Sequence, residues 1–176
     1  MKKTAAISTL FMAFMMLVSF NMNAQKFPGL DKSPLDIAYY KTSRSAPPIA
    51  KIVYSRPQLK GRSLASLAPD GKVWRTGANE TTEITFYSDV NFGGKSVKAG
   101  TYSLFTIPGE KNWTVILNSD LYTWGAYSYN EGKDVARIEV PVTSGKDSLE
   151  AFSIAFSKGS LNLGWDTLRI AIPLSK

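Results

Sequence analysis

The chain reads GTYSLFTIPGEKNWTVILN from Gly100 to Asn118, and this stretch decides the fold class. β-Branched and aromatic residues dominate both of its halves, and such side chains favour extended strands. The halves are separated by Pro108 and Gly109, a pair that is typical of a type II turn. The stretch therefore predicts a β-hairpin, with one antiparallel strand on each side of the turn.

The same pattern continues on both sides of this hairpin as short alternating segments bounded by turn residues. Further strands are expected over residues 36–42, 49–55, 83–87, 135–142, 149–156, 161–165 and 168–172. Turns are expected at residues 91–95, 144–147 and 158–159, and one short helix at residues 62–67. Turn signals at this spacing are typical of a β-sandwich or jelly roll. We therefore expect a single all-β antiparallel domain of roughly ten strands over residues 36–176.

The first 24 residues are expected to be a secretory signal peptide and not part of the fold. Two lysines are followed by an apolar run over residues 5–20 and by the small residue Ala24. A membrane anchor is the alternative, but the apolar run is at the short end of what spans a bilayer. Residues 25–35 then read as an extended lead-in. The protein is thus expected to be periplasmic or extracellular, with no transmembrane segment after cleavage.

The 176 residues include no Cys and no His. This excludes disulfides, thiol nucleophiles, Cys/His zinc sites and every catalytic triad or general base that needs an imidazole. The formal net charge is +7, yet the basic residues are scattered and interspersed with acidic ones. We therefore expect no nucleic-acid partner. Neither a cofactor nor a metal ion is expected.

Polar, charged and aromatic residues gather before the central hairpin. The six candidate ligand-binding residues are Arg56, Arg62, Trp74, Arg75, Asn79 and Glu80. Guanidinium groups suit a carboxylate, phosphate or sulfate, an indole suits the flat face of a sugar, and an amide both donates and accepts. The alternative is structural, because arginines in loops of β-sandwiches also pair with carboxylates and free carbonyls. The spacing does not separate the two interpretations.

Other constellations give weaker signals. A hydrolase with two carboxylates is the alternative function, but Glu80 and Glu83 are expected to face opposite sides of their strand. Residues 89–93 resemble the start of a calcium loop but lack its later acidic ligands. In the looser segment 120–133, Trp124 belongs either to a carbohydrate platform or to a flap over the end of the sandwich.

Six motifs carry a family resemblance. They are YSRP at 54–57, KGR at 60–62, VWRTGANE at 73–80, AGTYSLFTIP at 99–108, NWTVILN at 112–118 and WG at 124–125. In this order the motifs resemble the domain-of-unknown-function 2911 family, exported proteins that are frequent in Bacteroidetes. The resemblance implies an all-β exported domain and supplies no catalytic residue. We therefore expect an exported, non-enzymatic binding or envelope-associated module for a glycan or an anionic ligand, with a carboxylate-dependent carbohydrate hydrolase as the alternative.

Overall fold

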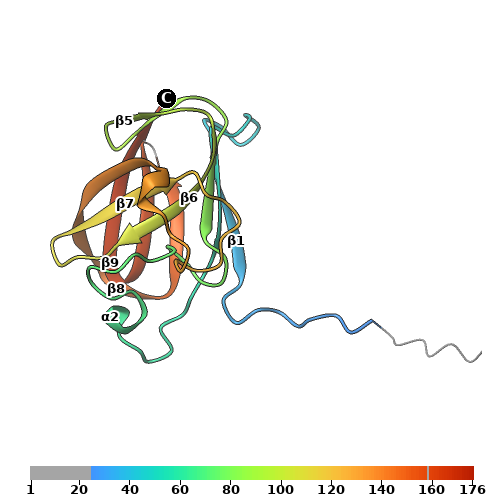
Figure 1. The fold of residues 1–176 in the computed structure, drawn as a ribbon, viewed down its shortest axis with the longest axis vertical. Helices are drawn as coiled ribbons and strands as arrows, with labels where there is room; N and C mark the ends of the chain where they lie inside the picture. Colours follow the sequence, from blue (N-terminus) through green and yellow to red (C-terminus); the bar gives the residue numbers. More distant parts are fainter. Residues whose placement is uncertain (1–24, 158) are drawn as a thin grey trace, which may run out of the picture. The chain divides into compact units, whose positions relative to one another are not determined.

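The structure, a computed structural model, describes residues 25–157 and 159–176 (Figure 1). The expected signal peptide, residues 1–24, lies outside the described residues. Residues 25–30 have no regular secondary structure, and their side chains are exposed. Residues 31–176 form one compact unit. Within the described residues, no helix has the length and apolar character needed to cross a membrane.

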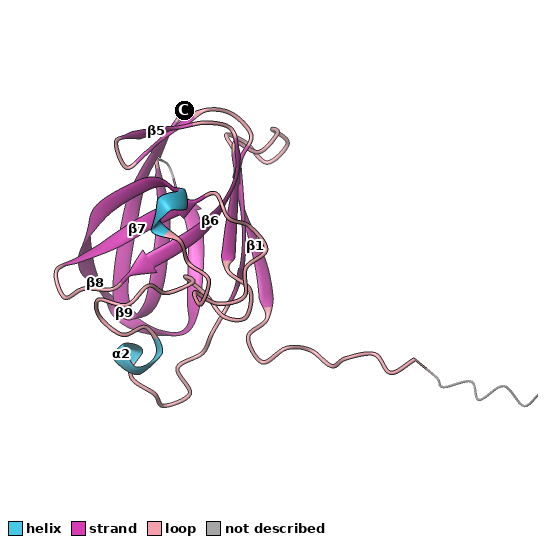
Figure 2. Cartoon of the chain, viewed as in Figure 1, coloured by secondary structure: helices cyan, strands magenta, loops and turns pink. Residues whose placement is uncertain are grey.

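This compact unit is built almost entirely of β-strands (Figure 2). Its strands are β1 Leu35–Tyr40, β2 Ala50–Ser55, β3 Thr82–Phe86, β4 Val90–Phe92, β5 Lys95–Val97, β6 Gly100–Ile107, β7 Asn112–Asn118, β8 Asp134–Ser157 and β9 Ser160–Ser175. Two single helical turns accompany them, α2 Leu64–Leu67 and η1 Glu131–Lys133. Ser63 caps α2 by accepting a hydrogen bond from the backbone amide of Ser66. The all-β prediction, the central hairpin and the short helix are confirmed.

The strands follow the order β1-β2-β3-β6-β7-β8-β9-β4-β5, and all neighbours are antiparallel. The first part of β8 pairs with β7 and its later part with β9, so this long strand joins the two halves of the sheet. In Figure 1, β8 and β9 run behind β6 and β7. The sheet also curls back on itself. Beyond β2, the amide of Leu59 donates to the carbonyl of Glu150, and the amide of Phe152 donates to the carbonyl of Pro57, so this segment is joined to β8. The curled sheet therefore encloses the core.

The sequence predicts a turn at residues 144–147, and this prediction is wrong. These residues lie within β8, where the pairing with β9 shifts register between Ser144 and Leu149. Ser144 pairs with Leu168 and Leu149 with Asp166, so β8 has the extra residues. Such a bulge absorbs turn-forming residues without reversing the chain. Two pairs of expected strands thus become the single strands β8 and β9.

Aromatic side chains form the centre of the core. The ring of Trp74 stacks on that of Trp165, with centroids 5.5 Å apart and an interplanar angle of 16°. Its edges meet the rings of Trp113 and Phe152, with centroids 6.0 Å and 5.1 Å away. The backbone of Trp74 also exchanges two hydrogen bonds with Thr106 of β6, of 2.7 and 2.9 Å. Stacked and edge-on contacts of this kind stabilise a core beyond the area that they bury.

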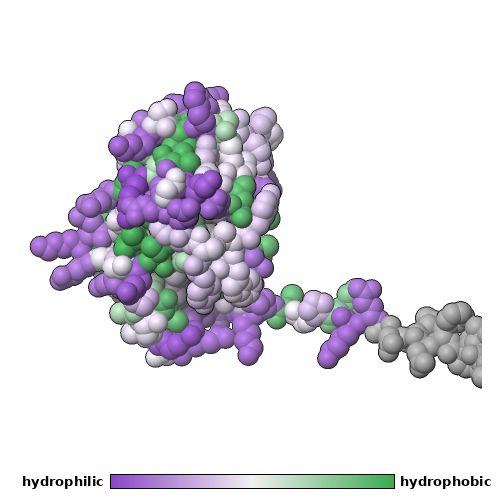
Figure 3. All heavy atoms as spheres, viewed as in Figure 1, coloured by the Kyte–Doolittle hydropathy of each residue, from purple (hydrophilic) through white to green (hydrophobic). Residues whose placement is uncertain are grey.

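The surface carries the charges. On the face drawn in Figure 3, hydrophilic side chains cover much of the compact unit, and hydrophobic ones form small patches between them. Ten large hydrophobic side chains are nevertheless exposed in the described chain, among them Tyr122 and Trp124 in the loop between β7 and β8. Since isolated apolar side chains on a surface are common, only those beside a cavity point to a binding site.

Candidate functional site

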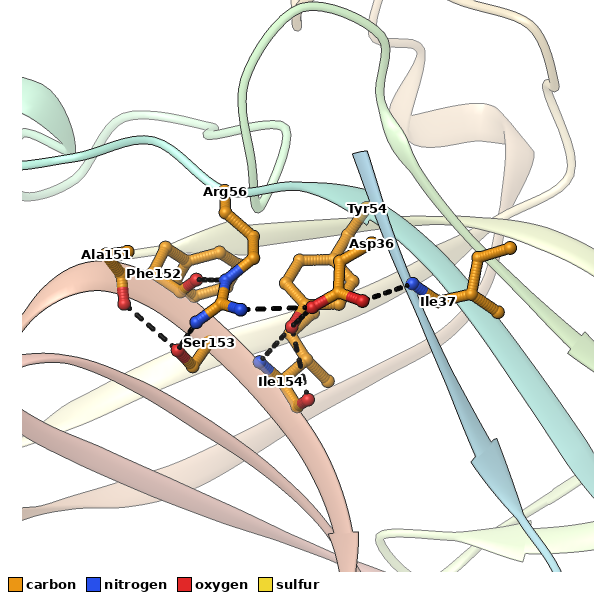
Figure 4. A network of polar contacts seen from close by, with 8 residues as sticks. All are labelled: Asp36, Ile37, Tyr54, Arg56, Ala151, Phe152, Ser153 and Ile154. Carbon is orange, nitrogen blue, oxygen red and sulfur yellow. Dashed lines mark hydrogen bonds and ion pairs between the residues drawn. The ribbon is translucent and has the colours of Figure 1, made fainter. Parts of the chain in front are cut away.

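Arg56 is held by partners from two other strands (Figure 4). Its Nη1 donates to the Oδ2 of Asp36 at 3.1 Å, its Nε to the carbonyl of Phe152 at 3.1 Å, and its Nη2 to the Oγ of Ser153 at 2.7 Å. All three nitrogens therefore have a partner within the protein. The guanidinium joins the end of β2 to β1 and β8, which is the structural role that the sequence left open.

Tyr54 completes this network from inside the core. Its hydroxyl accepts a hydrogen bond from the amide of Ile154 at 3.0 Å and lies 3.3 Å from the Oδ2 of Asp36. Burial is the main cause that raises the pKa of the Tyr54 hydroxyl. The phenol is thus neutral at physiological pH and can both donate and accept.

The guanidinium groups of the other two candidate arginines contact different neighbours. Arg62 turns back on its own loop, where its Nε and Nη2 donate to the carbonyls of Leu59 and Gln58 at 3.0 and 2.8 Å. The side chain of Arg75 lies against Gly125 in the loop after β7. A Cβ atom added to this glycine would be 3.2 Å from the Nη1 of Arg75. Its Nε is buried and has no hydrogen-bond partner within the described residues. The three arginines thus do not converge on one anion.

Trp74 occupies the core and not the surface. Only 8% of the residue is exposed, and Trp165 covers one face of its ring. A buried indole has no face to offer a sugar. The expected stacking role is therefore not available to Trp74 in this fold, and the structure separates it from Asn79 and Glu80.

Asn79 and Glu80 instead line an open cavity of about 570 Å³, called here the Trp124 cavity. Its floor is the outer face of the sheet, formed by Leu35 of β1, Val53 of β2 and Glu83 of β3. The side chains next to Val53 in sequence, Ile52 and Tyr54, belong to the core, so Val53 points away from it. One wall consists of Asp31 and Ser33, and the other of residues 79–81 and 122–124.

A short ladder builds the second wall. The amide of Thr81 donates to the carbonyl of Thr123 at 3.0 Å, and the amide of Gly125 donates to the carbonyl of Asn79 at 3.1 Å. Between these two bonds, Glu80 pairs with Trp124 across the ladder. This pairing places Trp124 opposite Glu80 at the rim, where Trp124 is 59% exposed.

Two residues of this cavity have left-handed backbone conformations. Asn79 has a φ of 59° and Tyr122 a φ of 60°. Asparagine tolerates this region, but a bulky aromatic residue there is an outlier. The amide of Tyr122 donates to the Oε1 of Glu83 at 3.2 Å, a bond that helps to hold the strained loop. Strain of this kind clusters at functional sites, which makes the cavity the best candidate for one.

Glu80 and Glu83 line the same cavity, so the expectation that they face opposite sides is wrong. Strict alternation begins only at Thr82, the first residue of β3, and Glu80 lies before it in the short ladder. Asp31 is a third carboxylate in the lining, and it accepts a hydrogen bond from the amide of Ser33 at 2.6 Å. That bond and one from the side chain of Asn79 lower the pKa of Asp31. Even so, no group of acidic residues in the described chain has an arrangement that would hold a metal ion.

Of the cavity residues, the sequence pointed to Asn79 and Glu80 as a site and to Trp124 as one of two alternatives. Asp31 and Tyr122 were missed, and Glu83 was considered only as a partner of Glu80 that faces the opposite side. The signal for Tyr122 was its place in a loop, two residues before Trp124. Asp31 gave no signal, because only the folding of the lead-in beside β2 brings it to the cavity.

Comparison with known proteins gives a family for the chain. A family model described as "Protein of unknown function (DUF2911)" matches residues 38–174. The chain belongs to this family. The DUF2911 match begins within β1 and ends within β9, and it leaves out the cavity wall formed by Asp31 and Ser33. No curated protein and no solved structure matches the chain.

Two tyrosines are expected to make the free energy of unfolding depend on pH in the alkaline range. Burial, followed by a 2.7 Å hydrogen bond to Asp134, raises the pKa of Tyr129 to about 12, and the pKa of Tyr54 is also raised. In the unfolded chain both hydroxyls lose their proton near pH 10. The free energy of unfolding is therefore expected to be undiminished below about pH 10 and to fall as the pH rises from there towards 12.

Urea unfolding between pH 8 and pH 12 measures this effect. Tyr129→Phe serves as the matched variant, because it removes the titrating hydroxyl and keeps the ring that packs on Phe105. Its stability is expected to decline less steeply over the same range. Equal slopes for the two proteins would contradict the assignment to Tyr129.

Proposed function

We propose that this protein is an exported binding module that holds part of a glycan in the Trp124 cavity. The observation that carries the proposal is an exposed tryptophan that pairs across a short ladder with a glutamate, both in the lining of an open cavity. Sugars present apolar C–H faces, which pack on aromatic rings, and hydroxyl groups, which need polar partners. Trp124 and Tyr122 offer the rings, while Asn79, Glu80 and Ser33 offer the polar partners.

Export is part of this proposal, and its support is the leader-like sequence of residues 1–24. An exported glycan-binding domain would meet polysaccharides of the cell envelope or its surroundings. The scattered positive charge of the chain would favour association with anionic envelope polymers outside the cavity. An envelope-associated role is thus the cellular setting that we propose.

Tryptophan fluorescence offers a direct test. The chain has four tryptophans, and Trp74, Trp113 and Trp165 are buried, so Trp124 alone is open to an aqueous quencher. We expect an oligosaccharide that enters the cavity to protect this one residue from quenching by iodide or acrylamide. The screen would cover envelope polysaccharide fragments and neutral, acidic and amino oligosaccharides. Unchanged quenching with every member of the set would contradict the proposal.

Hydrolysis of a glycan is the second candidate function, and the shared cavity of Glu80 and Glu83 favours it. Glycosidases need one carboxyl group as acid and one carboxylate as nucleophile or base. In this arrangement the exposed Glu80 would protonate the leaving oxygen, and Glu83 would face the sugar ring from the floor. Release of reducing ends from the oligosaccharides that protect Trp124, and its loss in Glu80→Gln, would distinguish a hydrolase from a binding module.

A further inference from the structure

The charge of the Trp124 cavity is opposite to that of the whole chain. Asp31, Glu80 and Glu83 are in its lining, and no lysine or arginine is. Lys32 follows Asp31 in sequence, but its side chain is exposed and does not line the cavity. The chain as a whole has a formal net charge of +7. The cavity therefore concentrates negative charge on a positive protein.

The cavity carboxylates differ from the four carboxylates of the described residues that form ion pairs. Asp36 pairs with Arg56, Asp89 with Lys98, and both Glu131 and Asp134 with Arg137. None of the three cavity carboxylates has an ion pair within the described residues. Asp31 accepts one backbone hydrogen bond and one from the side chain of Asn79, and Glu83 accepts one backbone hydrogen bond, so each carboxylate still has free acceptor sites. Like charges that share a cavity repel one another, and a bound cation relieves that repulsion.

The aromatic rim points to the kind of cation. Tyr122 and Trp124 are both exposed and both line the cavity. The faces of such rings attract organic ammonium groups as well as the apolar faces of sugars. A bare metal ion would gain little from them, and the carboxylates of the described chain are not arranged to hold one. The cavity thus combines contacts for a ring with contacts for a positive charge.

We infer that the ligand of the Trp124 cavity is an amino sugar, a saccharide whose free amine is protonated at neutral pH. This inference rests on the proposed function and narrows its ligand class. The sugar ring would pack on Trp124, while its ammonium group would donate charge-assisted hydrogen bonds to the carboxylates of Glu80 and Glu83. An anionic glycan, by contrast, would meet three like charges.

The first test compares two ligands with the same sugar backbone, one with charged amines and one with neutral N-acetyl groups. Glucosamine oligomers with free amines and the same oligomers after N-acetylation are titrated into the protein by calorimetry, at a mildly acidic pH at which the amines are protonated. We expect the amine form to bind about tenfold more tightly, because it makes charge-assisted hydrogen bonds, and to lose this advantage in high salt. Equal affinities would overturn the inference and leave the proposed function intact. Failure of both forms and of the whole fluorescence screen would overturn the proposed function as well.

The second test removes charge from the protein and keeps its shape. Glu80→Gln and Glu83→Gln are each expected to weaken binding of the amine form by about tenfold and to leave the N-acetylated form unchanged. In Glu83→Gln, the amide oxygen of the new side chain can still accept the bond from Tyr122, so the loop keeps its support. Glu139→Gln, an exposed position on β8 outside the cavity, is the control and should not alter binding. An equal loss for both ligand forms would contradict a charge-specific contact.

Discussion

Trp74→Ala is expected to lower the free energy of unfolding by about 3–5 kcal/mol, the usual cost of emptying a large aromatic site in a core. The substitution removes the ring that stacks on Trp165 and meets Trp113 and Phe152. These three neighbours come from distant parts of the chain and cannot all close on the void. Urea unfolding followed by far-UV circular dichroism measures the loss.

The matched control is Trp124→Ala, which deletes the same side chain from the rim of the cavity. Because Trp124 is more than half exposed, its removal is expected to change stability by no more than about 0.5 kcal/mol. If Trp74→Ala changed the free energy of unfolding as little as Trp124→Ala, Trp74 would not be part of the core. Its ring would then again be a candidate for stacking on a sugar.

The second large effect concerns binding by the same control protein. Trp124→Ala is expected to weaken the binding of oligosaccharides that protect Trp124 from quenching by about 10–100-fold. This range corresponds to about 1.4–2.8 kcal/mol, the scale expected when a large apolar contact is lost. Calorimetry gives the affinity, since this variant lacks the fluorescent reporter. An unchanged Kd in Trp124→Ala would show that the Trp124 cavity does not bind the glycan.

Trp124→Phe refines this comparison. A phenyl ring keeps an aromatic face at the rim but presents a smaller one, so an intermediate affinity is expected. An affinity as low as that of Trp124→Ala would indicate that the indole N–H, and not the ring face, makes the contact.

Local features of the fold were predictable because they depend on neighbours in sequence. The hairpin of β6 and β7 and the Gly93-Gly94 turn between β4 and β5 lie where alternation and turn residues indicate. The bulge in β8 was not predictable, since turn-forming residues also fit a strand whose partner tolerates a register shift. Nothing local distinguishes these two outcomes at Gly145.

The residues of the candidate site also divide into those that the local sequence predicts and those that depend on distant parts of the chain. Asn79 and Glu80 were found because polar residues beside glycine mark irregular backbone, and that inference needs no long-range information. The structural role of Arg56 depends on its hydrogen bonds to Phe152 and Ser153, which lie more than ninety residues further along the chain. The burial of Trp74 likewise depends on Trp165. Sequence patterns identify residue types suited to binding, but long-range packing decides which of them reach the surface.

One wall of the Trp124 cavity has a consequence for how binding can diversify. Residues 31–33 lie ahead of β1 and ahead of the family match, and the amide of Arg56 donates to the carbonyl of the adjacent Pro34 at 3.0 Å. Changes at Asp31 and Ser33 would therefore alter the cavity without changing any strand pair. Under the proposed function, changes in this short segment are therefore expected to alter ligand preference while the sheet stays the same.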